Sequence, residues 1–186
     1  MSIDERVYRT CTYIAGDWTG DKDLVDQLKS WNTNNHLGLS YTDAHDLTQS
    51  RDTSHPCSIK QNLRKRLNVS KAFVLIVGDK TYSLTKGSCR FCPQYEHPAF
   101  GMPRCKSGLN LDYRSFIEYE CDMALKDYNA GKIKKIVVIY NGRRTVDKTK
   151  CPAALRSVGT HIASDCLNAE GKLCWNYGAI KSAICD

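Results

Sequence analysis

The chain has 186 residues and a formal net charge of +7 at pH 7. This length fits one domain, residues 1–186, which would bury about 70% of its unfolded surface, so size alone calls for no disulfide or metal. The charge favours anionic partners such as nucleotide phosphates. The basic residues are spread along the chain apart from two short runs, 60–66 and 132–135, so no nucleic-acid partner is expected.

The compartment is predicted from the first residues and from the apolar runs. Residues 1–6 are charged where a signal peptide would be apolar, and the longest apolar run, 72–77, is far too short to span a bilayer. We therefore predict a cytoplasmic protein with no membrane partner. In the reducing cytosol the 10 cysteines are expected to be free thiols or metal ligands rather than disulfides.

The first part of the chain predicts a strand, a helix and a second strand. Residues 9–15 carry β-branched and aromatic side chains, and the glycine-punctuated segment 16–21 follows as a loop. Apolar residues recur at helical spacing over 24–31, and residues 37–43 are expected to form a short strand. The polar run 44–56 is predicted to be a loop.

Helix and strand alternate again further along the chain. Ile59, Leu63 and Leu67 make one helix face. Ser58 is expected to start this helix. The continuously apolar run 72–78 is typical of a central parallel strand that helices cover on both faces.

Periodicity fades over residues 79–112, which we interpret as an irregular insertion or long loop within the domain. Cys89 and Cys92 form a CxxC pair there, and His97 and Cys105 follow. Thiolate and imidazole groups suit tetrahedral zinc, so these four residues are a candidate structural metal site. The alternative is a loop with free cysteines.

A capped helix is predicted after this segment. Ser115 and Glu118 have the spacing of a capping box, and residues 129–131 should end the helix. The remaining predictions are a covered strand over 134–140, a short helix opened by Pro152, a strand near 161–163 and a terminal helix over 177–184. Strands that alternate with helices imply a flavodoxin-like three-layer sandwich around a mostly parallel sheet of about four or five strands.

Glu120 is a candidate functional carboxylate. Ligands of open α/β sheets bind outside the carboxyl ends of the strands, and a helix that follows one strand brings its first turns to that rim. Glu120 falls on the flank of the apolar stripe 117–124, one turn after Phe116, and would face a half-buried cleft. The alternative is a solvated acid that the helix dipole favours.

Three loops and one helix motif carry a family resemblance. The predicted strands run into an aromatic and acidic loop (13–21), an acidic turn (43–46) and the segment Asp79-Lys80-Thr81-Tyr82-Ser83. The sharpest feature is Phe116-Ile117-Glu118-Tyr119-Glu120, which is similar to the Trp-Val-x-x-Glu pattern of TIR domains. Over about residues 9–140 the chain resembles the TIR-like proteins, in particular the bacterial and archaeal branch that includes the TIR-like subunit of Thoeris phage defence.

The resemblance implies a TIR-like fold and a signalling enzyme that cleaves NAD at the bond between nicotinamide and ribose, by hydrolysis or cyclisation. It assigns Glu120 as the catalytic carboxylate beside the ribose, with Phe116 next to it. NAD is then a substrate, no cofactor is required, and the products would act as second messengers.

Further residues are candidates for holding the dinucleotide. Tyr13 or Trp18 would stack on a base and Asp17 would accept a hydrogen bond from a ribose hydroxyl, although the same loop could equally plug the core. Asp43, with the neighbouring His45, ends the predicted second strand. A role in proton transfer competes there with a plain polar turn.

Two other classes of protein stay open. A non-catalytic TIR-like interaction module would assemble with itself or with a partner effector, and the basic helix 60–66 is one candidate surface. A receiver-like phosphorylation domain would use Asp79, but the acids after the first strand are not adjacent. An enzyme should show a cleft that joins Glu120 to the loop 13–21, whereas a scaffold should fill it.

Overall fold

A sheet of four parallel strands forms the centre of the computed structural model, which describes residues 9–34, 41, 55–106 and 108–185. The strand order is β1 (Cys11–Ala15), β2 (Ser70–Val77), β5 (Lys135–Tyr140) and β6 (Thr160–Ala163). The two apolar runs that predict covered strands are β2 and β5, because a parallel sheet is buried on both faces. The predicted α/β fold is confirmed, whereas the strand predicted over 37–43 lies outside the described residues.

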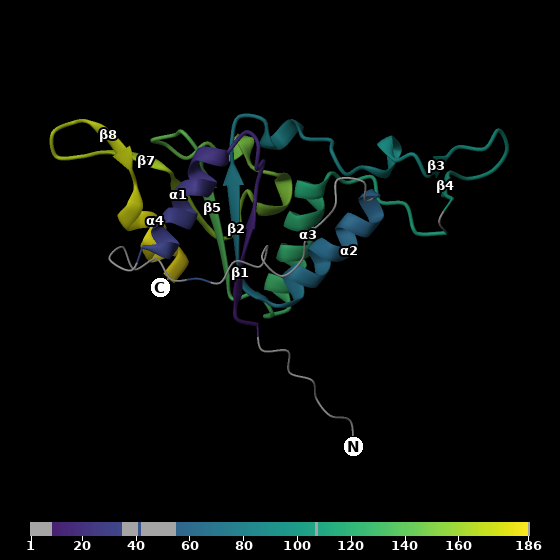
Figure 1. Cartoon of the computed structure of the whole chain (residues 1–186), viewed down its shortest axis with the longest axis horizontal. Coiled ribbons are helices and arrows are strands. Elements are labelled where there is room, and N and C mark those ends of the chain that lie inside the picture. The colour runs from purple at the N-terminus through teal and green to yellow at the C-terminus, as the bar shows by residue number, and fades with distance from the viewer. Residues whose placement is uncertain (1–8, 35–40, 42–54, 107, 186) are drawn as a thin grey trace, which may run out of the picture.

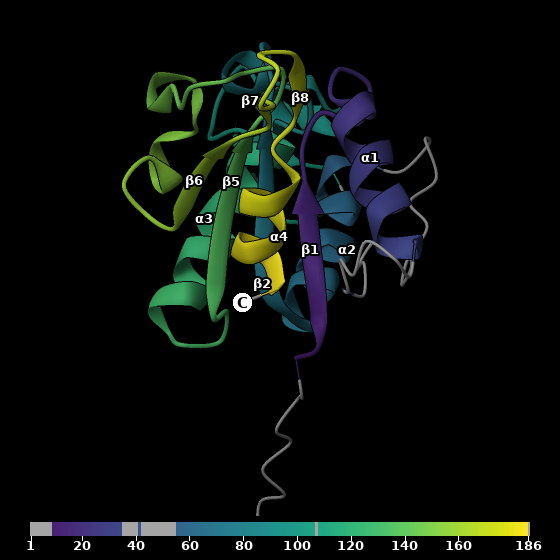
Figure 2. The ribbon, with the colours of Figure 1, turned by 90° about the vertical axis from the view of Figure 1, so that its left-hand side faces the viewer.

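Two pairs of helices cover the two faces of the sheet (Figures 1 and 2). Helices α1 (Lys22–Thr33) and α4 (Tyr177–Cys185) pack on one face, and α2 (Pro56–Asn68) and α3 (Phe116–Asn129) pack on the other. Alternate side chains of β2 serve the two faces, with Phe73 toward α2 and α3 and Val74 toward α1 and α4. The three-layer sandwich follows from this alternation.

The start of α2 differs from the prediction. The helix begins at Pro56, with His55 as the flanking residue, so Ser58 lies inside the first turn rather than before it. Proline at the first helical position explains the earlier start, because its fixed φ suits a helix and its missing N–H would have no partner there.

The connection from β2 to α3 forms an arm, residues 87–115, that projects from the α2 and α3 side of the molecule (Figure 1). It follows the short helix η2 (Thr81–Ser83) and contains η3 (Cys89–Phe91) and two short antiparallel strands, β3 (Tyr95–Glu96) and β4 (Arg104–Cys105). Its two ends meet at the start of α3. There the N–H of Cys89 donates to the carbonyl of Asp112 at 3.0 Å, and the N–H of Phe116 donates to the carbonyl of Lys86 at 2.9 Å.

The C-terminal part adds a hairpin at the carboxyl end of the sheet (Figure 2). After β5 come η4 (Lys148–Lys150) and η5 (Ala153–Leu155), the latter a single turn where Pro152 predicts a short helix. Strand β6 is followed by the antiparallel strands β7 (Asp165–Leu167) and β8 (Leu173–Trp175), which the sequence did not predict. Among the described residues, no helix has both the length and the apolar character needed to cross a membrane.

Candidate active site

The capping box at the start of α3 fixes where the helix begins. The hydroxyl of Ser115 accepts from the N–H of Glu118 at 3.2 Å, and the Glu118 carboxylate accepts from the N–H of Ser115 at 2.7 Å. The predicted cap is confirmed, and it gives Glu118 a structural role. It also sets the rotation of the helix, so that Glu120 faces the sheet rather than solvent.

Glu120 is a buried carboxyl, only 5% exposed. The hydroxyl of Tyr13 on β1 donates a hydrogen bond to its Oε1. Burial raises the pKa of Glu120 to about 7, against the opposing effects of the Tyr13 hydrogen bond and the positive charge of Arg66. A carboxyl with this pKa is about half ionised at neutral pH, which makes it a candidate functional group.

Tyr13 lies in the core and not in the loop at the carboxyl edge of the sheet. It is fully buried in the middle of β1, and its ring stacks on Phe73 with centroids 5.6 Å apart. The expectation that this ring stacks on a base of the dinucleotide is therefore corrected, since both the burial and the Phe73 contact exclude it. Its hydroxyl instead orients Glu120.

The other candidates of the first loop lie away from Glu120. Trp18 is half-buried and packs on the core between the sheet and α1, the opposite face from Glu120, with the Lys29 ammonium 4.7 Å from its ring centroid. Asp17 organises its own loop, accepting from the N–H of Thr19 at 3.1 Å. The structure thus does not bring Asp17 or Trp18 to Glu120, and Asp43 and His45 lie outside the described residues.

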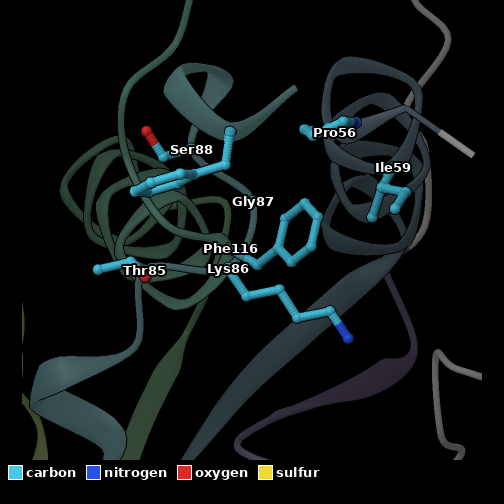
Figure 3. Close-up of a pocket in the computed structure, with 8 residues that line it drawn as sticks. Pro56, Ile59, Thr85, Lys86, Gly87, Ser88 and Phe116 are labelled. Carbon is cyan, nitrogen blue, oxygen red and sulfur yellow. The ribbon is translucent and has the colours of Figure 1, made fainter. Parts of the chain in front are cut away.

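A pocket of about 350 Å³ lies beside the first turn of α3 (Figure 3). Its lining is mostly apolar, with one lysine, and comes from α2, the loop before the arm, the first residues of the arm and α3: Pro56, Ile59, Thr85, Lys86, Gly87, Ser88, Phe91 and Phe116. Gly87 has φ +103°, and a Cβ there would lie 2.4 Å from the Phe116 ring, so only glycine fits. Phe116 and Glu120 are one helical turn apart, so this pocket lies next to the turn of α3 that carries the buried carboxyl.

A second pocket, of about 640 Å³, lies where the arm joins α2 and α3. Lys60 is buried there, and its ammonium donates to the carbonyls of Asp112 and Arg114 at 3.1 and 2.6 Å. Arg66 is also buried, and Arg64 pairs with Asp127 at 3.0 Å. These contacts use three of the four cations of residues 60–66 within the fold and leave Lys65 exposed, so the basic docking surface on this helix stays a prediction.

Neither of these two pockets is lined by Glu120 or by residues 13–21. The side chain that occupies the space between Glu120 and the first strand is Tyr13 itself. Neither pocket therefore joins the carboxyl to the loop 13–21, the cleft that an enzyme should show.

Sequence reasoning missed a polar cluster at the carboxyl edge of the sheet. Asp21 is 3% exposed, and Asn141 after β5 donates to Asp21 at 3.1 Å and to Asp23 at 2.9 Å. Burial raises the pKa of Asp21, and a Cβ at Gly78 would lie 2.0 Å from its Oδ1. The signal was present, because these residues follow β1, β2 and β5, whose carboxyl ends share one edge.

The four predicted zinc ligands are not gathered into one site. Cys89, Cys92 and Cys105 are buried and His97 is exposed. The sulfur of Cys89 accepts from the N–H of Asp112 at 3.3 Å. Within the described ranges no group of three or more His, Cys, Asp or Glu residues is placed to hold a metal ion, so the zinc site stays a prediction.

Comparison with known families gives a match within the first half of the chain. Residues 11–86 match the family model described as Thoeris protein ThsB, TIR-like domain. The match supports the TIR-like family. It covers β1 to the residue before the arm, so the Glu120 helix lies beyond the matched segment, and no curated protein matches the chain. The similarity to a Thoeris TIR-like domain over this segment supports a role in defence signalling.

Proposed function

We propose that this TIR-like chain cleaves NAD at the bond between nicotinamide and ribose and releases a hydrolysed or cyclised signalling nucleotide. The observation that carries the proposal is the buried carboxyl of Glu120, on the helix whose motif is similar to the TIR pattern. A hydrogen bond from Tyr13 on β1 holds this carboxyl in place. Carboxyls with strongly shifted pKa values gather at functional sites, because burial that weakens stability is kept where it serves chemistry.

The chemistry asks for one carboxylate next to the ribose. Breaking the bond to nicotinamide develops positive charge on the ribose, as in glycoside hydrolysis, and nicotinamide leaves as a neutral ring. The ionised Glu120 would stabilise that charge in surroundings of low polarity, where electrostatic interactions are strong. Arg66 lowers the pKa of Glu120 and so favours the ionised form.

The pocket beside Phe116 supports a place for part of the dinucleotide. A volume of about 350 Å³ lies at the small end of ligand sites, enough for one ring and its sugar rather than the whole of NAD. Its apolar walls suit a base, and the Lys86 ammonium suits a phosphate. Glu120 would be reached beneath Phe116 once that ring moves aside.

A non-catalytic interaction module is the second candidate, and the arm favours it. Phe91, Phe100 and Met102 are 71%, 95% and 84% exposed. Large apolar side chains left in water on a projecting segment are typical of contact surfaces, in this case for another copy of the chain or for an effector protein. In that case the Tyr13 and Glu120 pair would serve only the fold.

Nicotinamide release from NAD tests the proposal. The purified full chain, at high concentration, should release nicotinamide that chromatography detects, and Glu120→Gln should lower the rate by about 100-fold or more. Glu118→Gln is the matched control, since glutamine keeps the capping box and the rate should stay within about twofold. Equal rates from wild type and Glu120→Gln, or no release by the wild type, would reject the enzyme and favour the interaction module.

A further inference from the structure

The two cysteines of the β7–β8 hairpin are thiols in contact. Cys166 and Cys174 are direct partners in the antiparallel register, and their sulfur atoms lie 3.4 Å apart. Paired residues of antiparallel strands have Cα atoms about 4.5 or 5.5 Å apart. Both separations fall in the range of about 4.4 to 6.8 Å that a disulfide requires, so side-chain rotation is enough to close the bond.

Hydrogen bonds of the hairpin turn fix the strand register that places the two thiols opposite each other. The N–H of Asn168 donates to the carbonyl of Lys172 at 2.9 Å. Its side-chain oxygen accepts from the N–H groups of Glu170 and Lys172 at 3.0 and 2.9 Å. Because the turn is fixed by its own hydrogen bonds, the encounter of the two sulfurs needs little further ordering.

Both thiols are open to small reagents. Cys166 and Cys174 are half-buried, whereas most of the other cysteines are buried. Two exceptions elsewhere in the chain are Cys57, half-buried, and Cys185, exposed. The hydrogen bond with Cys174 raises the pKa of the Cys166 thiol, so its reaction with oxidants should speed up as the pH increases.

We propose that Cys166 and Cys174 are a redox-modification site, which hydrogen peroxide converts to an intrachain disulfide. One thiol loses its proton, and its thiolate attacks the peroxide and becomes a sulfenic acid. The hydroxide that leaves takes up a proton and becomes water. The second thiol then attacks the sulfenic sulfur, forming the S–S bond and releasing a second water. The two thiols give up two electrons and two protons, which reduce the peroxide to two waters, and a dithiol reductant restores the thiols.

The bond would tie together the path from the sheet to the last helix. The N–H of Asn176, just before α4, donates to the carbonyl of Ser164, just after β6, at 2.7 Å. Trp175 lies edge-on to Trp31 of α1, with ring centroids 6.3 Å apart. Oxidation would therefore make the β7–β8 hairpin more rigid. This hairpin leads into α4 and carries Trp175, which packs against Trp31 of α1.

Peptide mass spectrometry of the full chain tests this site. The protein is treated with a small excess of hydrogen peroxide and quenched with iodoacetamide before digestion. We expect a linked Cys166–Cys174 peptide that lacks two hydrogens and disappears on reduction with dithiothreitol. Alkylation of these two cysteines should be lost, while alkylation of Cys185 should persist.

Serine variants separate this chemistry from general thiol oxidation. Cys166→Ser and Cys174→Ser should each abolish the link, and Cys185→Ser should leave it intact. The proposal is wrong if Cys166 and Cys174 stay fully alkylated after peroxide, if they are oxidised only singly to sulfinic acids, or if they link only between chains. None of these outcomes depends on cleavage of NAD.

Discussion

Two buried carboxyls of this protein differ in the charges around them. Glu120 and Asp21 are both nearly excluded from water, and burial raises the pKa of each. Glu120 has the positive charge of Arg66 nearby, whereas Asp21 has the negative charges of Asp17 and Asp23. The neighbouring charge favours the ionised form at Glu120 and opposes it at Asp21, where the Asn141 hydrogen bond acts in the other direction and lowers the pKa, so burial alone does not identify a catalytic carboxyl.

Glu120→Gln should give the largest change in stability. The pKa of Glu120 rises from 4.5 to about 7 on folding, so the unfolded chain loses this proton first as the pH increases. Between those two pH values the free energy of unfolding of the wild type should fall by about 3 kcal/mol, and Glu120→Gln should lack this fall. Urea denaturation at a series of pH values measures the free energy of unfolding of both proteins. If it depended on pH in the same way in both, the raised pKa of Glu120 would be wrong.

Asp21→Asn tests whether the second buried carboxyl also makes the stability depend on pH. The pKa of Asp21 is also raised, so the wild type should lose stability as the pH increases above 3.8, a lower starting point than for Glu120. The amide variant should remove this part of the pH dependence and leave the part due to Glu120. If a variant with both Asp21→Asn and Glu120→Gln kept the whole pH dependence of the free energy of unfolding, neither acid would be its source.

Gly78→Ala should break the Asp21 cluster and leave the Glu120 site alone. The new Cβ would lie 2.0 Å from the Asp21 carboxylate and force the cluster apart, at a cost of about 2 kcal/mol. Gly178→Ala in α4 is the control, because a Cβ there meets nothing within 4 Å. Urea midpoints compare the variants, and an unchanged midpoint for Gly78→Ala would show that Asp21 adapts freely.

Tyr13→Phe should have the smallest effect of the series. It removes the hydroxyl that donates to Glu120, so the pKa of Glu120 should rise further and unfolding at pH 8 should become easier by about 1 kcal/mol. Tyr82→Phe, at a 60% exposed position, is the control and should be neutral. Equal effects of the two variants at pH 8 would mean that the Tyr13 hydroxyl does not stabilise ionised Glu120.

Local sequence patterns predicted the layers of this fold, because periodicity reports which face of an element is buried. The runs that became β2 and β5, and the Ser115 cap, needed no tertiary information. The β7–β8 hairpin was missed because its strands have only 3 residues each and are set by the Asn168 turn rather than by alternation.

The candidate site was harder to predict, because it depends on which face of the sheet a side chain takes. Tyr13 and Trp18 lie 5 positions apart in the chain, yet one packs toward α3 and the other toward α1. Asp21 and Asn141 are brought together across the carboxyl edge by strand order, which a single sequence does not contain. Only the motif at Phe116 and Glu120 was local enough to be read directly.

The hydrogen bonds at the base of the arm make the sequence of the arm independent of the packing of the sheet. The chain enters and leaves at one point, fixed by the bonds of Cys89 to Asp112 and of Lys86 to Phe116. Each doubling of the length of a loop raises the entropic cost of closing it by only about 0.6 kcal/mol. The residues between these hydrogen bonds, 90–111, are thus a natural grafting position, where new sequence can be exchanged while the bonds and the Ser115 cap keep the helix that carries Glu120 in its place.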